Sequence, residues 1–130
     1  MATENEKQIE LSLEEHSDRG KFKFRLYFYK DASRHFYKTV KFDRFREDKY
    51  CISVCFLRMK MFKELFEMFP EEKLEKNPIP FIWSTLEDAY NHLKNNAKRD
   101  YCYNKELSRL NETLKNLDFK SVATCTAYTN

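Results

Sequence analysis

Cysteine and histidine are the side chains in this sequence best suited to metal binding or nucleophilic catalysis, but their spacing fits neither. There are four cysteines and three histidines. Cys51 and Cys55 would share one side of a strand, with His35 on its neighbour, whereas zinc sites usually take two cysteines from one tight turn. No local pattern pairs a cysteine with His35 or His92 as a catalytic base. We therefore expect no metal site and no cofactor.

Phosphate-binding loops and paired carboxylates are the other chemistry that the sequence disfavours. Gly20 is the only glycine, and loops that cradle phosphate need several glycines so that the backbone can approach the ligand. The acidic pairs at 14–15, 47–48 and 71–72 fall in expected turns or surface ends, where carboxylates are solvated. The chain is therefore predicted not to be an enzyme.

Length and composition favour one intracellular domain. With 130 residues, of which 42% are hydrophobic and 35% charged, the chain suits a single core beneath a highly charged surface. We expect one domain over residues 1–120 and a flexible tail over 121–130. The N-terminus is acidic and polar, unlike a signal peptide, and no apolar run approaches the roughly 20 residues that cross a bilayer. These features predict reduced thiols, a cytoplasmic or nuclear location and no membrane partner.

The clearest binding signal is the stretch KFKFRLYFYK at residues 21–30, in which large apolar residues alternate with cations and tyrosines. The whole chain carries a formal charge of +3. Residues 21–63 alone hold thirteen Lys or Arg and four Asp or Glu, a net charge of +9. A strongly basic middle in a nearly neutral chain indicates a polyanion as partner.

The elements around this stretch are predicted to form an α+β fold. Period-2 alternation of apolar residues predicts a four-stranded antiparallel meander, with Gly20 in its first hairpin turn. After residue 58 the period becomes that of amphipathic helices. No internal repeat is visible, and whether 85–118 is one helix or two stays open. The predicted ranges are strands at about 8–15, 21–30, 35–45 and 50–57, a helix at 59–69, and C-terminal helices at about 85–98 and 105–118.

One face of this sheet would carry the predicted binding site. Cations track a phosphate backbone, and aromatic rings stack on unpaired bases, which is worth about 1–3 kcal/mol per base. An exposed sheet suits a single strand better than a duplex. The sequence therefore predicts non-catalytic binding of single-stranded RNA or DNA. The predicted nucleic-acid-binding residues are Lys21, Lys23, Arg25, Tyr27, Tyr29, Tyr37 and Lys41.

Two segments resemble the PUR repeat, the four-strands-then-helix unit of Pur-alpha-type single-strand binders. FRLYFYKDASRHFYKTVKF, residues 24–42, is similar in pattern to the central hairpin of that repeat. CISVCFLRMKMFKELFEMF, residues 51–69, is similar to its last strand and helix. Whirly-type single-strand binders share a similar plan. The resemblance implies a sheet that binds single strands and, because PUR repeats work in pairs, a homodimer.

A protein–protein interaction adaptor is the alternative function. Leucines 107, 110, 114 and 117 recur at a spacing typical of a core face, but also of a helix that docks on a partner or on a second copy. The two functions differ in what the surface exposes. A nucleic-acid site requires exposed cations at residues 21–25 beside unburied tyrosines. An adaptor would bury those tyrosines under the C-terminal helices and leave an apolar patch elsewhere.

Overall fold

The computed structural model describes residues 11–117, and within this range the only regular elements are helices. No strand occurs among these residues, so the predicted α+β fold with its four-stranded meander is wrong. Residues 8–10 of the first predicted strand and the predicted tail at 121–130 lie outside the described range. The seven helices are α2 (Leu13–Arg25), α3 (Tyr29–Thr39), α4 (Arg46–Arg58), α5 (Phe62–Met68), α6 (Glu71–Lys76), α7 (Ile82–His92) and α8 (Asn96–Asn116).

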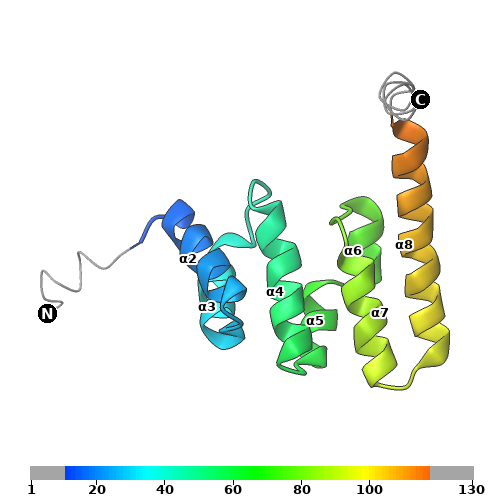
Figure 1. Cartoon of the computed structure of the whole chain (residues 1–130), viewed down its shortest axis with the longest axis horizontal. Helices are drawn as coiled ribbons and strands as arrows, with labels where there is room; N and C mark the ends of the chain where they lie inside the picture. The colour runs from blue at the N-terminus through cyan, green and yellow to red at the C-terminus, as the bar shows by residue number, and fades with distance from the viewer. Residues whose placement is uncertain (1–10, 118–130) are drawn as a thin grey trace, which may run out of the picture.

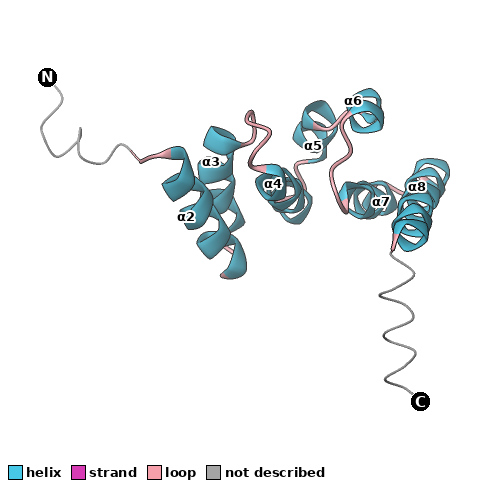
Figure 2. Cartoon of the chain, turned by 90° about the horizontal axis from the view of Figure 1, so that it is seen from above, coloured by secondary structure: helices cyan, strands magenta, loops and turns pink. Residues whose placement is uncertain are grey.

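The helices stack side by side in an elongated row (Figure 1). α2 packs on α3, α3 on α4, α4 on α7, and α7 on α8. Seen from above, α5 and α6 are set to one side of the line formed by α4, α7 and α8 (Figure 2). The stack therefore has two ends, one formed by the hairpin of α2 and α3 and the other by α8.

Three of the turns share one backbone geometry. α2, α4 and α7 each end in a Schellman motif, in which the residue after the C-cap is left-handed. These residues are Tyr27, Lys60 and Lys94, with φ values of 64°, 58° and 57°. In each turn the next N–H donates to the carbonyl five residues earlier: Phe28 to Lys23 at 3.0 Å, Met61 to Phe56 at 2.8 Å, and Asn95 to Tyr90 at 2.9 Å.

This turn recurs along the chain at a nearly constant interval. The three left-handed residues are 33 and 34 positions apart, which is the period of helix–turn–helix repeats of about 34 residues. The repeat is not visible in the sequence because the turn residues differ in type, and because the second hairpin returns as two short helices, α5 and α6, interrupted at Pro70. The fold is a short array of helical hairpins.

The four segments predicted as strands lie in helices and the turns beside them. Polar and apolar residues alternate along these segments, but buried and exposed residues do not. In order, they coincide with the start of α2, the end of α2 with its turn, α3 with the loop that follows, and α4. Ser12 begins α2 with a capping box, its Oγ accepting from the Glu15 N–H at 3.1 Å. The buried residues of α4 include Cys55, Ile52 and Leu57, which together span more than half of the helix circumference. A helix buried on most sides reads as an apolar run, which periodicity cannot distinguish from a strand.

Gly20 is not in a hairpin turn, as the sequence predicted, but in the middle of α2, and no glycine among the described residues has a positive φ. A Cβ atom at this position would meet the Phe36 ring on α3 at 2.6 Å from Cε1. Glycine is therefore required by the close approach of two helices and not by backbone conformation.

A buried carboxylate joins the first three helices. Asp48 on α4 is fully buried, and its two oxygens accept hydrogen bonds from Ser17 Oγ at 3.0 Å and Thr39 Oγ1 at 2.7 Å. Lys21 Nζ lies 3.9 Å from the same carboxylate. Hydrogen bonds to a buried charge are needed to offset its desolvation. This polar centre lies beside the apolar core, whose fully buried members include Phe36, Phe56, Ile52, Leu65, Ile82 and Leu86.

The helices predicted in the second half have other boundaries. α5 is shorter than the predicted helix at 59–69. α7 begins at Ile82, three residues before the predicted helix at about 85–98. Residues 85–116 form two helices whose break lies at 93–95, where Asn95 caps α8 by accepting from the Lys98 N–H. Tyr101 lies inside α8.

Candidate interaction surfaces

The residues predicted to bind nucleic acid do not form one face, because the sheet that would have aligned them is absent from residues 11–117. Lys21 points back into the protein, where its Nζ lies 3.2 Å from Glu47. Its pKa is raised: burial, the largest single effect, lowers it, but the hydrogen bond to Glu47 and the charges of Glu47 and Asp48 together outweigh burial. Tyr37 on α3 packs edge-on against Phe56 on α4, and Lys41 lies in the loop beyond α3. The structure does not test nucleic-acid binding itself, which stays a prediction.

Four of those seven residues do gather, at the turn between α2 and α3. Lys23 and Arg25 end α2, Tyr27 is the left-handed turn residue, and Tyr29 begins α3. Tyr29 packs edge-on against Phe24, with ring centroids 6.0 Å apart, and is partly buried. Tyr27 is 76% exposed. The sequence therefore located a real concentration of cations and rings, but on a helix turn.

Large apolar side chains without cover surround this turn. We use the name α2–α3 tip for Phe22, Leu26, Tyr27 and Phe28, all of which are exposed. The Lys23 Nζ lies 5.5 Å from the centroid of the Phe28 ring, in cation–π geometry. The tip is therefore both apolar and cationic.

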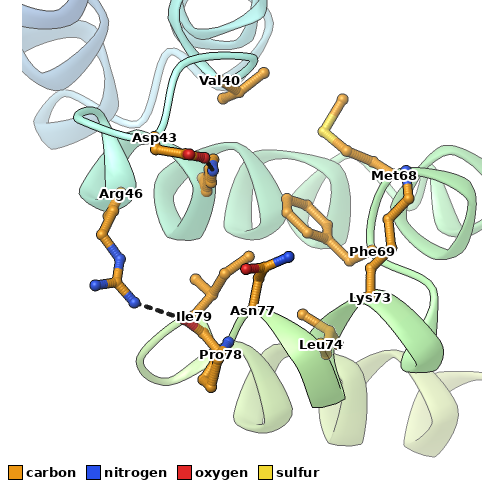
Figure 3. A pocket seen from close by; sticks show the side chains of 11 residues that line it. Val40, Asp43, Arg46, Met68, Phe69, Lys73, Leu74, Asn77, Pro78 and Ile79 are labelled. Atoms are coloured by element: carbon orange, nitrogen blue, oxygen red, sulfur yellow. Dashed lines mark hydrogen bonds and ion pairs between the residues drawn. The ribbon is translucent and has the colours of Figure 1, made fainter.

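A pocket of about 440 Å³ lies between the α3–α4 loop, α5, α6 and the segment before α7 (Figure 3). Phe69, Leu74 and Ile79 give it an apolar lining. Its charged rim is engaged within the protein, since Arg46 donates to the Pro78 carbonyl at 2.8 Å, and Lys49 lies 3.3 Å from Asp43. No cysteine, histidine, serine or threonine lines the pocket, so it offers no pair of nucleophile and base.

Of the three described cysteines, Cys55 and Cys102 are buried and Cys51 is partly buried. Burial raises the pKa of Cys51 to about 11 and that of both Cys55 and Cys102 to about 12, so each is a neutral thiol at physiological pH. No cluster of three or more metal-ligating side chains forms within residues 11–117. The thiols pack in the helix interfaces as small apolar groups.

His16 and His35 form a pair between α2 and α3 that the sequence gave no reason to expect. Their Nδ1 atoms lie 3.1 Å apart, so one ring donates and the other must be unprotonated at that nitrogen to accept. Burial, with the nearby charges of His16, Arg19 and Lys23, lowers the pKa of His35. The pair is a helix contact that requires at least one neutral ring.

The second apolar surface runs along α8. We use the name α8 stripe for Tyr103, Leu107, Leu110, Leu114 and Leu117, all of which are exposed. Every described residue from Leu110 onward is exposed. The sequence identified these leucines by their spacing, but a core face was the commoner meaning of that pattern. The structure leaves the stripe uncovered by any other described element.

The fold and its surfaces define a class before any comparison: an array of helical hairpins, which displays side chains along its length and at its ends. None of the helices within residues 11–117 combines the length and apolar character needed to cross a membrane. No family model, characterised protein or solved structure matches the chain. The proposals below therefore rest on the geometry of these surfaces.

Proposed function

We propose that the protein is a non-catalytic protein–protein interaction module that assembles with a second copy through α8. The observation that supports this most strongly is the α8 stripe, whose leucines are exposed at 39%, 40%, 64% and 48% in chain order. A contiguous row of large apolar side chains on a protein surface usually marks an interface.

None of the other described helices lies beside the C-terminal half of α8. α8 has 21 residues and α7 has 11, so at 1.5 Å per residue α8 is longer by about 15 Å. Its first half is anchored by Lys98 to Glu71 at 3.0 Å, and further along Arg109 lies over the Phe81 ring at 4.7 Å. The C-terminal part of α8 extends past the rest of the stack, as Figure 1 shows.

The stripe has the spacing of a coiled-coil seam. Its members follow one another at intervals of 4, 3, 4 and 3 residues, which places leucine at consecutive a and d positions. In the C-terminal half of α8, the e and g positions that flank this seam are Asn111 and Thr113, which are uncharged. Glu112 and Lys115 lie off the seam. Two copies of this helix can therefore pair without bringing like charges together.

The opposite end of the stack does not offer a matching apolar face. The exposed residues along α2 are mainly charged, among them Glu14, Glu15, Asp18 and Arg19, with Phe22 near the tip as the exception. Because the outer face of α2 has no row of leucines like the α8 stripe, the stack favours a closed pair, α8 to α8, over an open filament. This asymmetry makes a second copy the preferred occupant of the stripe.

The test compares molar mass by light scattering for the wild type and for Leu110→Gln/Leu114→Gln. We expect a wild-type mass twice the chain mass of 15.9 kDa and a monomeric variant. Losing four leucine contacts at about 1 kcal/mol each, about 4 kcal/mol in total, weakens the pair by roughly a thousandfold. Ser108→Gln/Glu112→Gln, on another side of α8, is the matched control and should stay dimeric. A monomeric wild type at high concentration would refute the proposal.

A further inference from the structure

The α2–α3 tip is a second exposed surface, far along the stack from α8 (Figure 1). Its four side chains are exposed at 58% for Phe22, 46% for Leu26, 76% for Tyr27 and 51% for Phe28. They lie on the last turn of α2 and in the connection to α3, so they project from the end of the hairpin and form a convex surface. A convex apolar knob inserts into another phase more readily than it accepts a ligand.

Tyr27 occupies a backbone conformation that its side chain does not favour. Its φ of 64° is left-handed, at the C′ position where glycine is the usual residue. Lys60 and Lys94 occupy the same position in the other two turns. A bulky aromatic ring there gains little from burial in the protein, because most of it is in solvent. Its presence is therefore better explained by something outside the chain that the ring contacts.

The charge around the tip has one dominant sign. Lys23, Arg25 and Lys30 lie within three residues of its members, and the nearest acid, Asp31, is 3.9 Å from Arg34. The other two left-handed turns lie at the same end of the helices (Figure 1). They add cations along this edge, at Arg58, Lys60, Lys63 and Lys94, against the acids Glu64 and Glu67.

We propose that the α2–α3 tip docks on an anionic lipid surface. Phe22, Leu26 and Phe28 enter the boundary between headgroups and acyl chains, where Phe and Leu are the preferred anchors of interfacial segments. Tyr27 lies at the headgroup level, with an apolar ring and a polar hydroxyl. The flanking cations bind the acidic headgroups, and this attraction falls within a Debye length. The contact is peripheral and independent of pairing through α8.

A single-stranded nucleic acid is the competing partner for the same residues. Cations and tyrosine rings suit it equally, but Leu26 offers no ring for stacking, and a convex turn has no groove to hold a backbone. The apolar side chains of the tip therefore distinguish a lipid surface from a single-stranded nucleic acid as its partner. Removing Leu26 should weaken binding to lipid and leave binding to an oligonucleotide almost unchanged.

The test is co-sedimentation with phosphatidylcholine vesicles, with and without phosphatidylserine, over a salt series. We expect binding only with phosphatidylserine, and weaker binding as salt rises. Lys23→Gln/Arg25→Gln should reduce partitioning by about fivefold per cation. Leu26→Ser/Phe28→Ser should reduce it at least as much. Binding of a labelled single-stranded oligonucleotide is measured for the wild type and for the same variants.

Tyr27→Gly separates a lipid contact from a structural role. Glycine relieves the left-handed backbone, so the variant should be at least as stable as the wild type while its partitioning falls. Lys94→Gly, at the equivalent turn, should gain stability in the same way, and its loss of vesicle binding should not exceed the roughly fivefold expected for one cation. Absence of binding to phosphatidylserine vesicles at low salt would overturn the proposal, as would an oligonucleotide that binds instead and depends on Lys23 and Arg25.

Discussion

Gly20 lies so close to the ring of Phe36 that a Cβ atom on residue 20 would come within 2.6 Å of Cε1. The contact sets the distance between α2 and α3. Two further contacts join the same helices, the His16–His35 pair and the hydroxyls of Ser17 and Thr39 that converge on Asp48. The first hairpin is therefore held by small and polar groups more than by apolar area.

Gly20→Ala should destabilise the protein although alanine is the better helix former. The added methyl group forces the helices apart, at a cost of about 1–3 kcal/mol in the free energy of unfolding, against a propensity gain of about 1 kcal/mol. Urea denaturation measures the difference. In a double-mutant cycle, Phe36→Leu should reduce the cost of Gly20→Ala. A more stable Gly20→Ala variant would show that the helices are not in close contact.

Asp48→Ala should lower the free energy of unfolding by about 2–4 kcal/mol, because the hydroxyls of Ser17 and Thr39 lose their charged acceptor inside the protein. Asp18→Ala, which removes an exposed acid from α2, is the control and should change stability little. Thermal or chemical unfolding of the two variants gives the comparison. Equal stabilities would mean that the carboxylate does not join the helices.

The His16–His35 pair should make stability depend on pH. The pKa of His35 is lowered in the folded protein from 6.5, chiefly by burial, so the unfolded chain binds more protons just below that pH. The contribution of the pair to the free energy of unfolding should therefore be fully present above pH 6.5. It should be lost as the pH decreases through the folded pKa of His35. His35→Gln should flatten this part of the profile. An unchanged profile in the variant would assign the acid sensitivity to other groups.

Cys51, Cys55 and Cys102 should react slowly with alkylating reagents in the native protein. Their pKa values of about 11, 12 and 12, raised by burial, leave almost no thiolate at neutral pH. Mass spectrometry of peptides after brief treatment with iodoacetamide, with and without urea, identifies the modified sites. Rapid modification of these three cysteines without urea would mean that the helix interfaces open readily.

Some of this structure was predictable from the sequence. The change to a helical period after residue 58 was visible. The leucine spacing that forms the α8 stripe was also apparent. Its exposure was not, because spacing shows that residues share a helix face and not whether another element covers it.

The first half was mispredicted for a physical reason. The inward face of α2 includes Ser17 and Gly20, which hydropathy patterns do not register, while Phe22, Leu26 and Phe28 are exposed. Apolar residues outside and small residues inside invert the usual pattern, so the alternation at 21–30 favoured a strand. The segment is unusual because its exposed residues form the tip to which we assign a binding role.

The measurement that tests the assembly of two copies most directly is amide hydrogen exchange of α8 at low and high protein concentration. No other element within residues 11–117 covers residues 110–117, so their amides should exchange quickly when the protein is dilute. Pairing through the α8 stripe predicts strong protection of this segment at high concentration, lost in Leu110→Gln/Leu114→Gln. The same exchange rate at all concentrations, with the rest of the fold protected, would contradict it.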